Sequence, residues 1–374
     1  MKNKEIYALG VMSGTSIDGI DFSLIRSDGR KSVDIIFNHY VKFNLKIKEK
    51  IRYIIDQFKH NPFEVVKNNS TYADIEKEFN QLIISKVKFI FSKNEFNIKD
   101  LDLIGIHGNT LIHDPKKNIS LQLGDYSFIS KTLNKKVVAN FRDKDMSLGG
   151  EGAPLVPIYH QAIFSKKNKN IVVVNIGGIS NFSLLIGDEK IVASDLGPGN
   201  VLIDKYCNIK FNKPFDKNGL FASSGLVDEN LLKVWMKKSF LRKQYPKSFD
   251  NSFFQINDFV DKKNQNLNKA NMLRTLTFFS AKVISELKKI TPGKIDKWVF
   301  CGGGVKNITL MNDLKKILKG NQIFISDELG IDSDFVESSA FAFISIRTYY
   351  KIPSAFPETT GCAIKNICGN VYYP

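Results

Sequence analysis

Apolar positions in the first part of the chain form short uninterrupted runs followed by one long helical repeat. The runs at 6–12 and 20–25 have the length and composition of buried strands, so residues 13–19 must turn tightly between them. Residues 33–43 continue the strand-like pattern, and from Ser70 onward apolar residues recur at helical spacing. The pattern predicts a hairpin, a further strand and then an amphipathic helix.

The second half of the chain repeats this plan. A buried run at 171–176, a Gly/Ser turn at 177–181 and a second run at 182–186 predict another hairpin. A helical pattern follows at 271–290, and then a strand that ends in three glycines at 302–304. Two such hairpins, each opening one half of the chain, predict an α/β protein with two structurally related domains facing one cleft.

The length of the chain also favours two domains, since 374 residues is long for a single core. We place the N-terminal domain at 1–140 plus 349–374, where it holds the first hairpin. The C-terminal domain takes 141–348 and holds the second hairpin.

The turn of the first hairpin has the composition of a phosphate-binding site. Glycines let backbone N–H groups approach an anion, hydroxyls add hydrogen bonds, and a carboxylate can hold a hydrated magnesium ion. The alternative is a Gly/Ser-rich turn that binds no ligand. The residues concerned are Ser13, Gly14, Thr15, Ser16, Asp18 and Gly19.

A glycine-rich loop at 140–157 marks the predicted domain boundary. Such a loop is costly in chain entropy unless it wraps around something. Arg142 at its entrance could bind a carboxylate or a phosphate through its forked guanidinium. The alternative is a salt bridge to Asp143 or Asp145 within a linker.

Asp195 is the candidate general base. It ends the predicted strand at 191–194 and precedes the Gly197-Pro198-Gly199 turn, so its carboxylate would be rigidly held and yet exposed. The alternative is an ordinary turn or helix-capping carboxylate, which is common before Gly-Pro.

Three further positions are weaker candidates. The glycines at 302–304 would let a flat group or a phosphate lie against the backbone where a strand becomes a helix. His107 follows a short buried strand and could line a cleft, although a lone histidine in a loop is more often structural. Glu337 begins a helix, where the helix dipole favours a carboxylate whatever its function.

The charge balance adds little to this picture. Lys and Arg number 54 against 38 Asp and Glu, a formal charge of +16, but the lysines are scattered among Asn, Ile and Phe without a nucleic-acid-binding motif. We expect no nucleic-acid partner, although a positive field would help to gather an anionic nucleotide and an anionic sugar. Four widely spaced cysteines indicate a reducing compartment, and no apolar segment is long enough for a signal peptide or a membrane span. We therefore expect a cytoplasmic protein with no membrane contact.

The string Gly-Val-Met-Ser-Gly-Thr-Ser-Ile-Asp-Gly-Ile-Asp at 10–21 resembles the N-terminal signature of anhydro-N-acetylmuramic acid kinases. That family belongs to the actin, sugar kinase and Hsp70 ATPase superfamily, so the resemblance implies two ribonuclease-H-like domains with the active site in the cleft between them. It also implies ATP and Mg²⁺ as cofactors, an amino-sugar substrate and a homodimer.

The resemblance implies a coupled reaction in peptidoglycan recycling. Water opens the 1,6-anhydro bridge of the sugar while the freed O6 takes the γ-phosphoryl group of ATP, giving N-acetylmuramic acid 6-phosphate. Asp195 would be the catalytic base, and Arg142, Glu337 and His107 would contact the sugar. The residues implied in ATP binding are Gly14, Thr15, Ser16, Ile17, Asp18, Gly19, Ile20, Asp21, Gly177, Gly178, Gly197, Gly199, Gly302, Gly303 and Gly304.

Two departures from the family pattern leave alternatives open. Asn109 stands where the family usually has Gln, and residues 246–252 read Pro-Lys-Ser-Phe-Asp-Asn-Ser where the family usually has Pro-Lys-Ser-Thr-Gly-Arg-Glu. The chain could therefore be another sugar or acid kinase of the superfamily, which a substrate panel would reveal. It could also be a non-catalytic nucleotide sensor, which would bind ATP without turnover.

Overall fold

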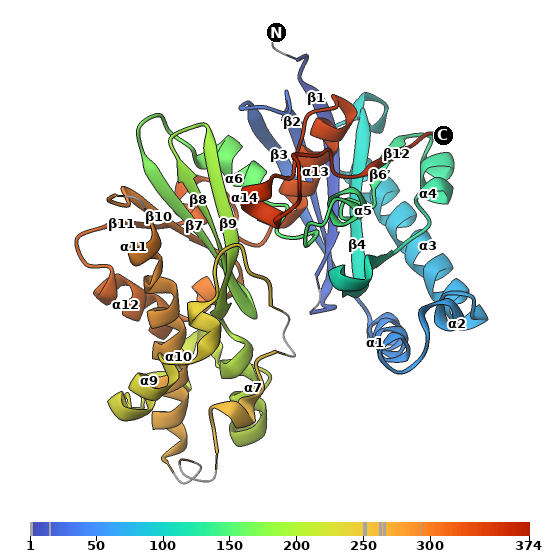
Figure 1. The fold of residues 1–374 in the computed structure, drawn as a ribbon. Coiled ribbons are helices and arrows are strands. Elements are labelled where there is room, and N and C mark those ends of the chain that lie inside the picture. Colours follow the sequence, from blue (N-terminus) through green and yellow to red (C-terminus); the bar gives the residue numbers. More distant parts are fainter. Residues whose placement is uncertain (1–2, 15, 250–252, 262–263, 265–266, 292) are drawn as a thin grey trace. The chain divides into compact units, whose positions relative to one another are not determined.

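A computed structural model describes residues 3–14, 16–249, 253–261, 264, 267–291 and 293–374. The chain forms two compact units, Met1–Ile163 with Glu337–Pro374 and Phe164–Val336, here called the first and second unit (Figure 1). These limits differ from the expected boundaries after 140 and 348, because residues 141–163 and 337–348 pack within the first unit.

The first unit is built on a seven-stranded mixed sheet of order β12-β6-β4-β1-β2-β3, with β5 paired to β4. β1, β2 and β3 run antiparallel in succession, whereas β4 is parallel to β1 and β6 is parallel to β4. The strands are β1 Ile6–Ser13, β2 Gly19–Ser27, β3 Val33–Lys42, β4 Leu103–Asp114, β5 Ile119–Leu123, β6 Lys136–Ala139 and β12 Asn370–Tyr372.

The second unit repeats this order in a five-stranded sheet, β11-β10-β7-β8-β9. Three antiparallel strands again follow one another, and β10 and β11 extend the sheet in parallel. Its strands are β7 Asn170–Ile176, β8 Ile179–Ile186, β9 Lys190–Pro198, β10 Lys297–Cys301 and β11 Gln322–Ile325. Both sheets have the order of ribonuclease-H-like domains, so the predicted fold class and the predicted repeat of the hairpin plan are confirmed.

Helices cover both faces of the first sheet. Leu9 and Val11 of β1 share a buried core with α1 (Leu45–His60), α3 (Ser70–Lys93) and α4 (Tyr126–Leu133). Alternate residues of a strand face opposite sides of the sheet, so position 10 faces away from this core. A Cβ atom on Gly10 would lie 1.8 Å from the Ser338 carbonyl oxygen, so α13 (Val336–Tyr349) packs directly on the strand backbone. This close packing explains why α13 belongs to the first unit.

The remaining helices of the first unit are shorter. They are α2 Phe63–Lys67, α5 Asp143–Ser147, α6 Pro157–Phe164, whose last residue lies across the unit boundary, and α14 Pro357–Thr360. Two 3₁₀ turns also occur, η1 Ile98–Asp100 and η2 Pro115–Lys117.

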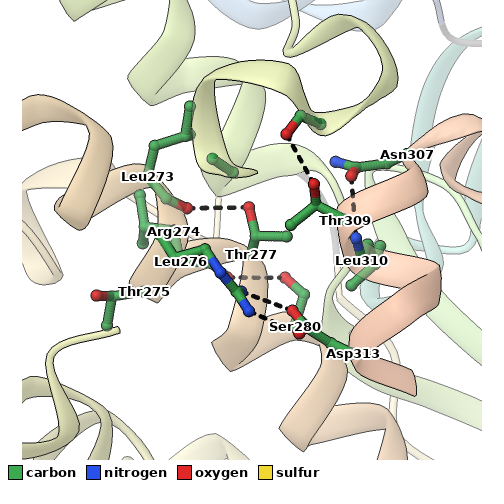
Figure 2. A network of polar contacts seen from close by, with 12 residues as sticks. Leu273, Arg274, Thr275, Leu276, Thr277, Ser280, Asn307, Thr309, Leu310 and Asp313 are labelled. Carbon is green, nitrogen blue, oxygen red and sulfur yellow. Dashed lines mark hydrogen bonds and ion pairs between the residues drawn. The ribbon is translucent and has the colours of Figure 1, made fainter. Parts of the chain in front are cut away.

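Helices of the second unit pack around α10 (Lys269–Ser285), which lies beside α12 (Ile308–Ile317). Arg274 of α10 and Asp313 of α12 form a two-bonded ion pair at 2.6 and 2.7 Å, with side chains 15% and 3% exposed (Figure 2). Thr309 of α12 donates to the Gly219 carbonyl oxygen at 2.8 Å. The other elements are α7 Val201–Phe211, α8 Leu220–Ser223, α9 Glu229–Trp235, α11 Leu287–Ile290, η3 Lys217–Gly219, η4 Ser239–Arg242, η5 Ile256–Asp258, η6 Gly303–Lys306 and η7 Ser326–Leu329.

Within the part of the chain that the structure describes, none of the helices is both long enough and apolar enough to span a membrane.

Candidate functional site

The first hairpin is closed by hydrogen bonds within its own turn. The Ser13 hydroxyl donates to the Gly19 carbonyl oxygen at 3.0 Å, and the Ile17 N–H donates to the Gly14 carbonyl oxygen at 3.1 Å. Ile17 has φ of 57°, an uncommon conformation for a β-branched residue and one that is found most often at functional sites. The described residues of this turn are therefore held in place by hydrogen bonds to one another.

Asn109, in the middle of β4, is hydrogen-bonded to this hairpin. Its amide nitrogen donates to the Ser13 hydroxyl at 3.1 Å and to the Gly14 carbonyl oxygen at 2.8 Å. Its amide oxygen is buried and has no hydrogen-bond partner among the described residues. From the sequence, position 109 was only a departure from the family pattern. In the structure its side chain holds the predicted phosphate turn.

The predicted ATP residues of the first unit lie on this hairpin. Gly14, Ser16, Ile17 and Asp18 form its turn, whereas Gly19, Ile20 and Asp21 begin β2. Thr15 lies outside the described residues. The Asp18 carboxylate is 64% exposed and lies 3.3 Å from the Lys48 ammonium, a neighbour that the sequence did not reveal.

Arg142, His107 and Glu337, predicted separately along the sequence, come together in the first unit, and we call them the Arg142 cluster. The Arg142 guanidinium donates to His107 Nε2 through Nε at 3.2 Å and Nη2 at 3.0 Å. Its Nη1 donates to the Gly152 carbonyl oxygen at 3.1 Å. Arg142 therefore does not make the alternative salt bridge to Asp145, whose carboxylate instead accepts from Gly152 N–H at 2.8 Å and Thr360 Oγ1 at 2.7 Å.

His107 is neutral in this arrangement. Its Nε2 accepts from Arg142, so its Nδ1 carries the hydrogen and donates to the Gly108 carbonyl oxygen at 3.0 Å. Burial, and then the positive charge of Arg142, hold the pKa of His107 well below its usual value. His107 thus orients the guanidinium and has no proton to give through Nε2.

Arg142 and Glu337 influence each other through charge. Burial lowers the Arg142 pKa to about 10, and the negative charge of Glu337 opposes this shift. Burial raises the Glu337 pKa, and the positive charge of Arg142 opposes it. The cluster therefore offers a cationic fork and a carboxylate that could bind a polar ligand bearing both an acid group and hydroxyl groups.

The second hairpin is joined to the turn that follows β9. The N–H groups of Gly199 and Val201 donate to the Gly178 carbonyl oxygen at 2.8 and 3.0 Å, and Asn200 N–H donates to the Gly177 carbonyl oxygen at 2.9 Å. A Cβ atom on Gly199 would lie 2.4 Å from the Gly177 oxygen, so only glycine fits there.

Two other features of this turn involve hydroxyls and packing. The Ser180 hydroxyl is fully buried and has no hydrogen-bond partner within the described part of the chain. Ser280 of α10 donates to the Gly199 carbonyl oxygen at 2.7 Å and thereby attaches the turn to α10. Gly197, by contrast, is a packing residue, because a Cβ atom there would lie 2.9 Å from the Phe240 ring.

Asp195 lies within β9, which continues to Pro198 instead of ending before Asp195 as expected, and the segment at 247–249 holds it. The Asp195 N–H donates to the Lys247 carbonyl oxygen at 3.0 Å, and the Asp195 carboxylate accepts from Phe249 N–H at 2.7 Å. Position 195 is therefore not a helix cap. Residues 250–252, which follow this segment, lie outside the described residues.

The three glycines after β10 differ in what surrounds them. A Cβ atom would lie 2.0 Å from the Asn175 amide oxygen at Gly302 and 2.2 Å from the Ile176 side chain at Gly304. At Gly303 nothing lies within 4 Å. Gly302 and Gly304 are thus required for packing on β7, and Gly303 leaves open backbone that a flat ligand could approach.

A site for Mg²⁺ would have to be built from few protein ligands in the described parts of both units. Neither part contains a group of three or more His, Cys, Asp or Glu side chains placed to hold a metal ion. Mg²⁺ in nucleotide sites is commonly held by one or two carboxylates, waters and the phosphates themselves. An exposed carboxylate such as Asp18, on the predicted phosphate turn, fits this mode of binding.

Sequence comparisons with known proteins identify one family. The family model for anhydro-N-acetylmuramic acid kinase matches residues 6–374. The anhydro-N-acetylmuramic acid kinase of Rhodopseudomonas palustris is 33% identical over 361 residues, covering 95% of this chain and 96% of that protein. An enzyme of the same name from Bacillus cereus is 35% identical over 390 residues, with 99% and 100% covered. Among solved structures, component A of the (R)-2-hydroxyglutaryl-CoA dehydratase of Acidaminococcus fermentans has 11% identity and a TM-score of 0.44, with 92% and 100% covered.

Proposed function

The chain belongs to the anhydro-N-acetylmuramic acid kinase family and is an ATP-dependent kinase of cell-wall sugar recycling, in which we propose that Asp195 is the general base. The observation that carries this assignment is the way Asp195 is held. Its backbone is fixed in β9 and its carboxylate accepts the Phe249 N–H at 2.7 Å. A base must be oriented before the reaction begins, and this geometry supports such a role.

The reaction that we assign to Asp195 balances in four changes. Water gives a proton to the Asp195 carboxylate as its oxygen bonds to C1 of 1,6-anhydro-N-acetylmuramic acid. The C1–O6 bond breaks with its electron pair on O6. O6 then bonds to the γ-phosphorus of ATP, and the bond from that phosphorus to the bridging oxygen breaks to release ADP. The products are N-acetylmuramic acid 6-phosphate, ADP and the proton that Asp195 returns to solvent.

The Arg142 cluster is the candidate sugar-binding site. N-acetylmuramic acid carries a carboxylate, which matches the cationic fork of Arg142, and hydroxyl groups, which match the Glu337 carboxylate. The role of His107 would be to hold the guanidinium through Nε2, at 3.0 and 3.2 Å, rather than to transfer protons.

The two glycine-rich hairpins and Gly303 are the candidate nucleotide contacts. Their backbone N–H groups and hydroxyls would bind phosphate oxygens, and a bound Mg²⁺ would neutralise part of the charge that builds up on the phosphates. Asp18 is the carboxylate on the first turn that could contact a water of that ion. The shape of the first turn, closed by Ser13 and Asn109, supports this assignment.

Mass analysis of the product tests the proposal. Purified protein with ATP, Mg²⁺ and 1,6-anhydro-N-acetylmuramic acid should yield a product heavier than the sugar by one water and one phosphoryl group. Asp195→Asn should lower kcat by at least roughly a hundredfold, as expected for loss of a general base. Asp327→Asn, an exposed position in the same unit, should keep wild-type activity. An Asp195→Asn enzyme as fast as wild type would rule out Asp195 as the base.

The homodimer and the cytoplasmic location also stay proposals. Light scattering of the purified protein and fractionation of cells would test them separately.

A further inference from the structure

We propose that Lys247 is a positioning residue for Asp195: it anchors residues 245–249 so that Phe249 N–H orients the carboxylate, and its buried ammonium attracts the same carboxylate. The inference rests on the proposed role of Asp195 as the base. It concerns a segment that the sequence marked only as a departure from the family pattern.

Both backbone polar groups of Lys247, its N–H and its carbonyl oxygen, are hydrogen-bonded to β9. Lys247 N–H donates to the Ser194 hydroxyl at 2.8 Å, and the Lys247 carbonyl oxygen accepts from the Ser194 hydroxyl and the Asp195 N–H, both at 3.0 Å. Two residues later, Phe249 N–H reaches the Asp195 carboxylate at 2.7 Å. Any movement of Lys247 would therefore move the donor that orients Asp195.

The Lys247 side chain is buried, which is unusual for a lysine. The residue is 8% exposed, and its ammonium donates to the Phe240 carbonyl oxygen at 3.1 Å and lies 4.5 Å from the centre of the Tyr245 ring. A buried charge is costly unless its surroundings compensate for it. A hydrogen bond to a carbonyl and an aromatic face both favour the charged ammonium, so they anchor this side chain inside the segment.

Aromatic packing gives the segment a rigid frame. The Phe249 ring lies 5.9 Å from Phe240 and 5.4 Å from Phe254, and Phe240 lies 5.1 Å from Phe254. Phe240 thus contributes both its ring and the carbonyl that binds Lys247.

The charge of Lys247 also acts on Asp195. Burial lowers the Lys247 pKa to about 8, the negative charge of Asp195 opposes that shift, and the exposed ammonium of Lys243 adds to it. The attraction is mutual, so loss of the Lys247 charge would remove a positive neighbour from Asp195. Among the described residues around the ammonium, the titratable groups are Asp195 from β9 and Lys243 and Tyr245 from the chain before it. The Tyr245 pKa is raised by burial and by Glu286, the residue that follows α10.

Three substitutions separate the two roles of Lys247. Lys247→Met removes the charge and the anchor, Lys247→Arg keeps the charge, and Ser194→Ala loosens the backbone attachment while leaving the charge in place. Lys243→Met is the matched control, because it removes an exposed ammonium 5.4 Å from the same Phe249 ring. The pH dependence of kcat/KM is measured for each, along with thermal unfolding.

On the acidic side of the pH profile, kcat/KM rises with pH as the base loses its proton, and this part of the profile is called the acidic limb here. Its position on the pH axis reports ionisation of the base. In Lys247→Met this limb should move up by about one pH unit, because the positive neighbour is lost, and kcat should fall roughly tenfold to a hundredfold as the base loses its orientation. Lys247→Arg should restore the position of the limb. Ser194→Ala should lower kcat with the limb unmoved, and Lys243→Met should match wild type in kcat.

Each result bears on the proposal in one direction. An unmoved limb in a folded Lys247→Met enzyme, or a Ser194→Ala enzyme with wild-type kcat, would overturn it. If Lys247→Met does not fold, the limb of Lys247→Arg decides, since a wild-type position supports the role of the charge and a raised one contradicts it. Failure of wild-type protein to make product, or an active Asp195→Asn enzyme, would instead overturn the proposed function.

Discussion

At the scale of single residues, the most informative contact is the one between the Arg142 guanidinium and the uncharged side chain of His107. Arg142 is oriented by a neutral histidine rather than by a carboxylate, so its positive charge is available to a ligand. The sequence indicated both residues but not that one holds the other. That relation depends on the tautomer of His107, which is set by the Gly108 carbonyl oxygen and leaves no trace in residue order.

Arg142→Lys tests this arrangement. Lysine keeps the charge but loses the fork, so it can satisfy neither His107 together with Gly152 nor a carboxylate through two parallel bonds. We expect KM for the sugar to rise by about 10- to 100-fold, the equivalent of one or two charge-assisted hydrogen bonds, with KM for ATP nearly unchanged. Steady-state kinetics with each substrate varied in turn gives both constants. An equal rise in the two KM values would mean that Arg142 is not specific to the sugar.

At the scale of elements, the apolar pattern predicted the strands and long helices well, but it did not predict where the helices end. The helix expected at 271–290 is present, but it divides into α10 and α11 at Glu286. Helices end at Asn134 and Asn212 with φ of 50° and 51°, in the left-handed conformation usually taken by glycine. Such ends depend on backbone shape, which hydrophobic periodicity does not report.

Polar contacts between elements far apart in the chain could not be predicted from the sequence either. Arg274 and Asp313 lie far apart in the chain, and each has the appearance of an ordinary charged residue on a helix. Together they form the buried ion pair that joins α10 to α12 (Figure 2). Thr309, on α12 with Asp313, donates to the Gly219 carbonyl oxygen.

Breaking this pair should cost more than replacing it. Asp313→Ala leaves a guanidinium that is only 15% exposed without its partner and should lower the free energy of unfolding by about 3–5 kcal/mol. The double substitution Arg274→Met with Asp313→Leu should be much less destabilising, since apolar residues can fill the same space. Denaturant titration of single and double variants measures the difference. The exposed pair Lys289–Glu286 is the control, and its loss should cost no more than about 0.5 kcal/mol. A double variant as unstable as Asp313→Ala would contradict this account.

At the scale of the whole molecule, stability in mild acid depends on groups that folding has shifted in opposite directions. Burial lowers the pKa of His160 from 6.5 to about 3, so between these values the unfolded chain binds a proton that the folded one does not. Stability conferred by His160 is therefore lost as the pH falls below 6.5. Asp204 behaves oppositely, because burial and then Asp216 raise its pKa from 3.8 to about 7, and the folded state binds the proton first.

Two variants should accordingly show opposite trends. The free energy of unfolding of wild type minus that of His160→Gln should fall by up to about 1.4 kcal/mol for each pH unit below 6.5. The corresponding difference for Asp204→Asn should rise as the pH falls from 7 towards 4. Urea unfolding at pH 7, 6 and 5 measures both. Parallel curves for His160→Gln and wild type would show that His160 is not held neutral in the folded protein.

The way the chain returns to the first unit has a consequence for how the protein is made. On the ribosome, β1 to β6 emerge first, yet the helix that packs against Gly10 and Gly105 is translated only after residue 336. The second unit is a single uninterrupted stretch of chain, so it can complete its fold while the sheet of the first unit still lacks α13 and β12. A nascent chain therefore exposes one face of its first sheet until synthesis is almost finished, and that face is where a chaperone would be needed most.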